Sequence, residues 1–408
     1  MKKPELLIPA GSLDVLKVAV RYGADAVYVG GEAFGLRANA KNFSMDDLRE
    51  GIAFAHAHDV KVYVTANIYA HNEDLDGVRA YFEELKEIKP DALLISDPGV
   101  YRIWAEVCPE IDLHVSTQSN NVNYGTFLFW QNLGAKRVVT GRELSLAEIR
   151  EIRANIPDDL EIETFVHGAM CISYSGRCLL SNYMTGRDAN RGACTHPCRW
   201  QYSIVEEKRP GEYMPVFENE RGTYIFNSKD LCMVEHLPDM IAAGIDSLKV
   251  EGRMKTALYV ATVARTYRKA IDDYFEDPKK YEENMPWYLD QISDGTFRQF
   301  TTGFFYGKPD ESAQIYDANT YIKTYTYIGT VQGMDADGRV VWTQKNKFCV
   351  GDTIEIMKPD GENIAVTVRS IRDAEGNEMP SAPHSKQELH VDIGIAAEPL
   401  DIIRQAAE

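Results

Sequence analysis

Residues 92–143 read ALLISDPGVYRIWAEVCPEIDLHVSTQSNNVNYGTFLFWQNLGAKRVVTGRE, in which β-rich runs alternate with amphipathic segments. The alternation extends in both directions along the chain, and the intervening stretches, such as 45–59 and 144–156, carry helical periodicity and open on Ser or Asp caps. Strand alternating with helix indicates a parallel sheet, and eight repeats predict a (β/α)8 (TIM-like) barrel, an α/β fold. The eight runs are 6–10, 26–30, 62–67, 92–97, 113–118, 137–143, 162–168 and 247–252.

One interval breaks the regular spacing of the runs. Roughly 80 residues separate the seventh run from the eighth, where about twenty to thirty are usual in this fold. Catalytic groups of such barrels lie on the loops after the strands, so an insertion after strand seven is expected on the active face. We therefore predict a barrel over residues 1–310 that carries a cysteine-rich insert at about 168–235.

The pattern changes after the eighth run. Residues 254–275 predict a long helix, and 277–310 a mixed linker packed on the barrel. Short β-rich runs with Asp-Gly turns at 337–338 and 360–361 then predict a small C-terminal antiparallel β-barrel over 318–408. This second domain is either a plain structural module or one that faces RNA.

Charge is distributed unevenly along the chain. Lys and Arg number 44 against 62 Asp and Glu, a net charge of −18, which argues against a general nucleic-acid-binding surface. The stretch from Cys171 to Trp200 differs, because its four arginines face a single acid, Asp188. If RNA or another anion binds, we expect it there. The arginines are Arg177, Arg187, Arg191 and Arg199.

The compartment follows from the N-terminus and the cysteines. The opening MKKPELLIPAGS holds only a short apolar run broken by Pro9, too short for a signal peptide, and no run approaches 18 apolar residues. We therefore expect a cytoplasmic protein with no membrane contact. In a reducing compartment, clustered thiols bind metal or do redox chemistry more often than they form disulfides.

The cysteines have an irregular spacing, C171-x6-C178-x15-C194-x3-C198, with Cys232 further along, so that five of seven lie within 62 residues. Structural zinc sites favour two short knuckles, and only Cys194 and Cys198 have that spacing. Four irregularly spaced thiolates favour a 4Fe-4S cluster, whose negative charge nearby arginines would stabilise. Zinc and unligated structural thiols remain alternatives, as does simple pairing of the arginines with local acids.

Strand parity supplies a second constellation, because alternate residues of a barrel strand face its interior. Ionisable groups buried there are costly unless paired, so their concentration near strand ends predicts a binding or catalytic site. The alternative is a set of core salt bridges, mostly on Glu161 and Lys249. The inward-facing sets are His114, Ser116 and Gln118 on strand five, Glu161, Glu163, Phe165 and His167 on strand seven, and Ser247, Lys249, Glu251 and Arg253 on strand eight.

We assign roles within these sets by chemistry. Asn67, Asp97, Arg142 and Glu143 lie at other strand ends and are candidates for the same pocket. The expected catalytic residues are His167, Glu163, His114 and Glu251, and the expected substrate-binding residues are Arg142, Lys249, Arg253, Gln118 and Asn67.

Hydrolase signatures are missing from the chain, which has neither H-E-x-x-H nor G-x-S-x-G. A nucleophile assembled from distant segments stays open as an alternative. Cys171 beside His167 is one such pair, but a cluster ligand cannot also be a free nucleophile.

Three segments together resemble the signature of peptidase family U32, the collagenase-like peptidases. They are ETFVHGAMCISYSGRCLLSNY (163–183), RGACTHPCRWQY (191–202) and SLKVEGRMK (247–255). The runs at 9–31 and 114–120 fit the same family, so the resemblance extends through the whole barrel.

The resemblance implies a barrel with a 4Fe-4S cluster held by Cys171, Cys178, Cys194 and Cys198, with Cys232 as the alternative ligand. It further implies hydroxylation of the wobble uridine of tRNA to 5-hydroxyuridine, with prephenate as co-substrate. Ribosomal cytidine and quinone precursors are substrates of other members, and peptidase activity is the rival function. Related proteins act in pairs, so the implied partners are tRNA and a homologous chain, or a homo-oligomer.

The candidate residues fit that chemistry. A small dicarboxylate such as prephenate needs cations, which Arg142, Lys249 and Arg253 supply. A flipped base would be taken up near the insert by Trp200 and Tyr202. The expected RNA-binding residues are Arg177, Arg191, Arg199 and Trp200.

Overall fold

The chain forms two compact units, neither of which is continuous in the sequence. In this computed structural model the first comprises Met1–Ser12, Ala26–Met254 and Arg298–Tyr321, and the second Leu13–Asp25, Lys255–Phe297 and Ile322–Glu408. The residues described are 2–31, 42–171, 173–174, 177–189, 192–200, 203–205, 213–215, 217–219, 222–224, 229–294, 296–309, 313 and 322–407.

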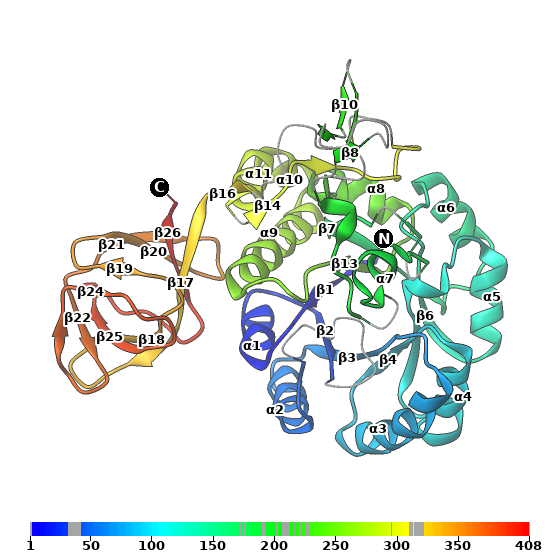
Figure 1. Ribbon diagram of the computed structural model, residues 1–408, viewed down its shortest axis with the longest axis horizontal. Helices are drawn as coiled ribbons and strands as arrows, with labels where there is room; N and C mark the ends of the chain where they lie inside the picture. The colour runs from blue at the N-terminus through cyan, green and yellow to red at the C-terminus, as the bar shows by residue number, and fades with distance from the viewer. Residues whose placement is uncertain are drawn as a thin grey trace. The chain divides into compact units, whose positions relative to one another are not determined.

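The first unit is built on a closed barrel of eight strands, as the periodicity predicts. Strands β1 to β7 pair in sequence order, and β13 pairs with both β1 and β7, which closes the ring with every pairing parallel. Figure 1 shows this ring of strands. The strands are β1 (Glu5–Pro9), β2 (Ala26–Gly30), β3 (Lys61–Ala66), β4 (Ala92–Ile95), β5 (Asp112–Val115), β6 (Ala135–Val139), β7 (Glu161–Ala169) and β13 (Ser247–Val250).

Helices of the first unit surround these strands on the outside, as α2 to α6 do in Figure 1. Residues at the N-termini of two of these helices explain where the helices begin. Ser44 and Asp47 form a capping box at α2, and Ser145 and Glu148 form another at α6. Each cap stabilises its helix by about 1 kcal/mol. The helices are α2 (Met45–His56), α3 (Leu75–Ile88), α4 (Pro98–Val107), α5 (Tyr124–Asn132), α6 (Leu146–Ala154) and α8 (Leu237–Ala242).

Several strands end earlier than the β-rich runs suggest. Polar residues at the ends of these runs, such as Asn67, Asp97 and Gln118, therefore belong to the loops that follow the strands. Asp97 caps α4 by accepting from the amides of Gly99 and Val100, and residues Thr117–Ser119 form a 3-10 turn. These loops are the carboxyl-end loops of the barrel.

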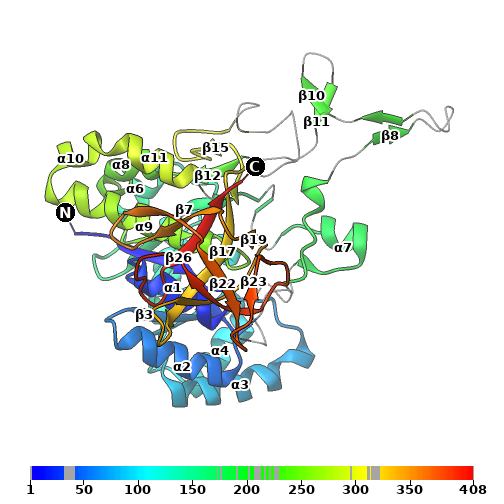
Figure 2. The ribbon, with the colours of Figure 1, turned by 90° about the vertical axis from the view of Figure 1, so that its left-hand side faces the viewer.

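The insert lies between β7 and β13, and its described residues include helix α7 (Leu180–Thr185) and a 3-10 turn, η4 (Pro197–Arg199). Two small hairpins follow, β8 (Ser203–Val205) with β9 (Tyr213–Pro215) and β10 (Phe217–Asn219) with β11 (Gly222–Tyr224). Strand β12 (Asp230–Cys232) then runs antiparallel to β7 and parallel to β15 (Phe300–Thr301). In Figure 2 the insert lies on the side opposite the N-terminus, at the carboxyl ends of the strands.

The second unit combines a curled antiparallel sheet, which confirms the predicted C-terminal β-domain, with four helices. The sheet has the strand order β21-β20-β26-β17-β18-β25-β22-β23. The helices are α1 (Leu13–Arg21), α9 (Ala257–Glu276), α10 (Pro278–Glu283) and α11 (Met285–Ser293). The main strands are β17 (Tyr325–Met334), β18 (Val340–Thr343), β20 (Thr353–Met357), β21 (Asn363–Thr367), β22 (Ser370–Asp373), β23 (Glu378–Met379), β25 (Glu388–Asp392) and β26 (Ile402–Ala406). The short paired strands are β14 (Thr296–Phe297) with β16 (Ile322–Lys323) and β19 (Phe348–Cys349) with β24 (Ser381–Ala382).

Buried side chains join these helices to the sheet. The Tyr22 hydroxyl donates to the carbonyl of Met357 at 2.5 Å and accepts from the amide of Ile402 at 3.1 Å. Arg265 of α9 donates to the carbonyl of Lys358 at 2.9 Å and to the side chain of Asn363. The segment 277–310, predicted as a mixed linker, is partly helical, and its helices α10 and α11 belong to this second unit. Among the described residues, no helix is both long enough and apolar enough to cross a membrane.

Candidate functional site

The interior of the barrel holds a charged network centred on Arg137 of β6. Its guanidinium contacts Glu5 (2.5 Å), Glu161 (2.6 Å) and Glu163 (3.2 Å), and its side chain is buried. Burial alone would raise the pKa of Glu5, but the charge of Arg137 and the hydrogen bonds that the carboxylate accepts together outweigh that effect and hold the pKa below its ordinary value. Ser247 Oγ and the Tyr63 hydroxyl also donate to Glu5. Glu5, Glu161 and Ser247 begin their strands, so this part lies at the amino end of the barrel, where stabilising rather than catalytic groups are usual.

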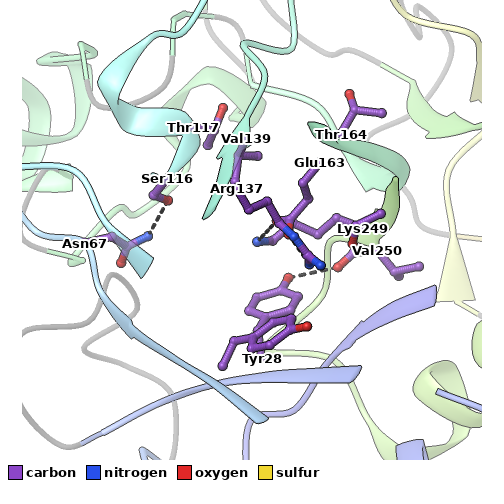
Figure 3. A network of polar contacts seen from close by, with 12 residues as sticks. Tyr28, Asn67, Ser116, Thr117, Arg137, Val139, Glu163, Thr164, Lys249 and Val250 are labelled. Atoms are coloured by element: carbon purple, nitrogen blue, oxygen red, sulfur yellow. Dashed lines mark hydrogen bonds and ion pairs between the residues drawn. The ribbon is translucent and has the colours of Figure 1, made fainter. Parts of the chain in front are cut away.

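The network continues inward through Lys249 of β13. Its Nζ lies 2.6 Å from Glu163 Oε1, and both side chains are buried. The ammonium also lies over the ring of Tyr28 at 4.5 Å, and Figure 3 shows it between Glu163 and that ring. Burial lowers the pKa of Lys249, and the neighbouring Glu163 opposes that shift. Glu163 and Lys249 thus form a buried ion pair, the arrangement that the salt-bridge alternative describes.

His114 is a neutral imidazole within the same interior. It packs edge-on against Tyr63 with ring centroids 4.6 Å apart, and its Nδ1 has no hydrogen-bond partner within the described part of the chain. Burial lowers its pKa well below the ordinary value, and the charges of Arg137 and Lys249 lower it further. At neutral pH it therefore carries no charge.

Polar side chains form a second cluster at the carboxyl ends of β3, β4 and β5. Asn67 Nδ2 donates to Ser116 Oγ at 3.1 Å, as Figure 3 shows, and to Gln118 Oε1 at 3.2 Å. Ser96 and Ser116 also donate to Gln118 Oε1, and the Tyr69 hydroxyl donates to the Gln118 carbonyl. These hydrogen bonds fix the orientation of two of the predicted substrate-binding amides.

Arg142 lies after β6 at the same end of the barrel. Its Nη2 is 3.1 Å from Glu251 Oε2, its Nη1 donates to the carbonyl of Ala169, and its guanidinium lies 3.9 Å over the ring of Phe165. Arg142 and Phe165 also line a small pocket with Met170, Leu231, Gly303 and Phe305. The predicted partners Arg142 and Glu251 are thus brought together as an ion pair at the carboxyl end.

Arg253 follows β13 and is almost fully buried. Its guanidinium donates to Thr65 Oγ1 at 2.9 Å and to Asn42 Oδ1 at 3.1 Å. It lies so close to Gly30 that a Cβ there would be 1.9 Å from Arg253 Nη2. The glycine that ends β2 therefore provides the space for this cation.

One strand-face prediction is wrong. The register of β7 against β13 shifts after Phe165 and Lys249, so that His167 pairs with Val250 instead of Glu251. This irregularity ends the alternation that placed His167 on the face of Glu163. The imidazole is buried with its ring 5.7 Å from that of Phe300 on β15, and His167 pairs across with Cys232 on β12.

The insert holds the remaining predicted residues. Cys171 is exposed, Cys178, Cys194 and Cys198 are half-buried, and Cys232 is buried. All seven cysteines lie among the described residues, and none is in a disulfide. Within the described residues, no three His, Cys, Asp or Glu side chains are gathered as a ready metal site.

The predicted RNA-binding residues differ in how far they are described. Arg177 is exposed and its guanidinium lies 5.8 Å over the ring of Tyr69, which places the insert next to the loop after β3. Trp200 is exposed. Arg191 and Tyr202 lie outside the described residues, as does the side chain of Arg199.

Several residues of these networks were not predicted from the sequence. Arg137, Ser96 and Tyr69 all take part in these networks. Arg137 could have been predicted, since it is a cation inside a β-rich run. Alternation along the strand puts its side chain on the same face as that of Val139. Of the other two strand-end acids, Asp97 caps a helix, and burial raises the pKa of Glu143.

The fold and the site together define a (β/α)8-barrel protein with polar clusters at the carboxyl ends of its strands and a cysteine-bearing insert over that face. The family model of "Peptidase family U32" matches residues 11–315, and that of "Peptidase family U32 C-terminal domain" matches residues 323–404. The chain belongs to peptidase family U32.

Similar proteins in other organisms agree with this family assignment. The chain is 43% identical to "tRNA hydroxylation protein P1" of Bacillus subtilis, over 95% of this chain and 91% of that protein. It is 40% identical to "tRNA hydroxylation protein P" of Escherichia coli, over 94% and 92%. A more distant relative is "23S rRNA 5-hydroxycytidine C2501 synthase" of Escherichia coli, 31% identical over 89% of this chain and 52% of that protein.

Proposed function

We propose that this protein hydroxylates the wobble uridine of tRNA to 5-hydroxyuridine. The observation that carries the proposal is the 43% identity with a tRNA hydroxylation protein over 95% of the chain. The relative named as a 5-hydroxycytidine synthase supports hydroxylation of an RNA pyrimidine more generally, although the chain spans only about half of its length.

The polar groups at the carboxyl end of the barrel suit a small dicarboxylate such as prephenate as co-substrate. Arg142 follows β6 and Arg253 follows β13, so two guanidinium groups lie at this end. Guanidinium binds carboxylate through paired, charge-assisted hydrogen bonds. The amides of Asn67 and Gln118 add neutral hydrogen-bonding groups that are already oriented. Lys249 takes a supporting role, because its ammonium is committed to Glu163 inside the barrel.

The thiols of the insert suit a 4Fe-4S cluster in number and kind. Cys171, Cys178, Cys194 and Cys198 would hold it, and Cys232 is the alternative ligand. Such a cluster supplies one-electron redox chemistry when bound.

Nucleoside analysis tests the proposed function. Deleting the gene, together with any homologue that compensates, should remove 5-hydroxyuridine-derived nucleosides from digested bulk tRNA in mass spectrometry, and the wild-type gene should restore them. Unchanged tRNA nucleosides, with loss of a ribosomal or quinone hydroxylation instead, would show that the substrate is another.

Peptidase activity is the rival, because the family carries that name. The sequence lacks the H-E-x-x-H and G-x-S-x-G motifs of common hydrolases. Denatured collagen should remain intact when it is incubated with protein purified without air. Cleavage that disappears with a single Ser, Cys or His substitution would favour the rival.

A further inference from the structure

Helix α7 of the insert differs from an ordinary surface helix, because its buried residue is polar and its aromatic residue is exposed. Helix α7 buries only Ser181, while Tyr183 is 85% exposed, and Leu179, just before the helix, is 67% exposed. Thirteen large hydrophobic side chains are exposed in the described part of the chain, and five of them lie between residues 174 and 200. Exposed hydrophobic residues concentrated in one short segment favour a binding surface, whereas single exposed hydrophobic residues are ordinary. The five are Tyr174, Leu179, Tyr183, Met184 and Trp200.

Hydrogen bonds hold α7 in this orientation. Ser181 Oγ donates to the carbonyl of Arg187 at 2.9 Å and accepts from the amide of Thr195 at 3.1 Å. The hydroxyl of Thr185 donates to the carbonyl of Ser181 at 2.8 Å and lies 3.3 Å from that of Thr195. Ser181 is thus the anchored residue of the helix, while Tyr183 and Met184 face solvent.

Charge shows which partner suits this surface. Arg177 and Arg187 are exposed beside it, and the only acid between Cys171 and Trp200 is Asp188, on a chain whose net charge is −18. Exposed aromatic rings next to arginines are the combination that binds single-stranded RNA, in which bases stack on the rings and cations contact the phosphates.

The surface also lies near the candidate site. Arg177 stacks over Tyr69, and the Tyr69 hydroxyl donates to the carbonyl of Gln118 in the polar cluster. A nucleotide held on the insert is therefore next to the carboxyl end of the barrel.

We propose that Tyr174, Tyr183 and Trp200 form a stacking surface for the unpaired bases of an RNA loop, with Tyr183 as its main ring. The inference rests on the proposed function, because it names where the RNA of that reaction binds.

Binding of a fluorescently labelled anticodon stem-loop RNA to the full-length protein tests the surface without turnover. Tyr183→Ala should weaken binding about tenfold, within the range for loss of one base–ring stack. Tyr183→Phe should keep the affinity of the wild type, and Tyr183→Leu should behave like Ala, because it is apolar but has no ring. Phe129→Ala is the matched control, since Phe129 is 56% exposed on α5 and should not matter.

Two further variants test the cations. Arg177→Gln and Arg187→Gln should each lower the slope of log affinity against log salt by about 0.7, the value for one phosphate contact of a single strand.

The outcomes separate this inference from the proposed function. Equal RNA affinity of Tyr183→Ala and the wild type overturns the stacking surface, even where tRNA hydroxylation depends on the gene. A Tyr183→Ala variant that changes only the oligomeric state in sedimentation also overturns it, and assigns the surface to a protein partner. Tight, ring-dependent RNA binding by a protein whose deletion leaves tRNA nucleosides unchanged supports the surface and overturns the proposed substrate.

Discussion

Glu163 and Lys249 lie 2.6 Å apart in the barrel interior, and Arg137 binds the other oxygen of the same carboxylate. Removing one member of such a group leaves a buried charge without its partner, whereas removing both leaves less unbalanced charge. These residues therefore belong first to the stability of the barrel, and through it to the position of the strand ends.

Substitution of the pair tests this role. Glu163→Gln and Lys249→Met should each lower the free energy of unfolding by about 3 kcal/mol, because each breaks a buried ion pair. The double variant should lose clearly less than the sum of the two. Urea unfolding followed by circular dichroism measures all three. Strictly additive losses would show that the two side chains do not interact in the folded protein.

His114 gives the barrel a specific pH dependence. Its pKa is lowered in the folded state by burial and by Arg137, while an unfolded imidazole takes up a proton near the ordinary value of 6.5. The unfolded chain then binds more protons below that value, so stability is lost as the pH falls, by at most about 1.4 kcal/mol per pH unit. The carboxyls of Glu5 and Glu161 have lowered pKa values and titrate at lower pH than this imidazole. Because burial raises the pKa of Glu143, Asp294 and Asp401, the contribution of His114 is taken from the difference between the wild type and a His114 variant.

The variant His114→Leu should flatten this dependence. We expect its free energy of unfolding to fall less steeply than that of the wild type between pH 6.5 and 5, with the two profiles parallel above pH 7.5. Identical slopes in that acid window would mean that His114 takes up a proton while folded.

At the scale of elements, the insert links the cysteines to the barrel face. Strand β12 pairs with the end of β7, and the register shift at Phe165 marks where β7 departs from regular pairing with β13. The segments with Cys171, Cys178, Cys194 and Cys198 all lie near α7 or η4. A cluster bound by these thiols would link the segments of the insert to one another as well as supply redox chemistry.

Protein purified without air should therefore contain about four irons and four acid-labile sulfides per chain. Single substitution of Cys171, Cys178, Cys194 or Cys198 by Ala should remove the iron and speed proteolysis between residues 171 and 200. Cys108→Ala should keep it, because burial raises the pKa of that thiol to about 12 and disfavours the thiolate that binds iron. Stoichiometric zinc without iron would contradict the cluster, and iron that survives Cys198→Ala but not Cys232→Ala would move one ligand.

At the scale of the whole molecule, the barrel could be predicted because its strands are buried, short and separated by regular helices. The periodicity that reveals each strand is local, whereas the contacts that complete the site are not. Arg137 meets Glu5 across 132 residues, and Tyr22 meets Met357 across 335. Because such contacts join distant parts of the sequence, the role of Arg137 in the interior could not be predicted from a local pattern. The same holds for the packing of α1 and α9 on the C-terminal sheet.

Local irregularities explain the other differences. Parity assumes an unbroken strand, and the register shift in β7 removed His167 from the predicted face. The exposed aromatic side of α7 escaped notice, because six residues are too few to show a period, and only the structure reveals that Ser181 is the buried side.

We propose that hydroxylation of a tRNA uridine by this protein depends on the thiols of the insert. Complementation of the deletion strain with Cys178→Ala, beside the wild type and Cys108→Ala, tests it in one set of tRNA digests analysed by mass spectrometry. We expect 5-hydroxyuridine-derived nucleosides to return with the wild type and Cys108→Ala and to stay absent with Cys178→Ala at equal protein level. Full restoration by Cys178→Ala would show that the hydroxylation does not depend on this thiol.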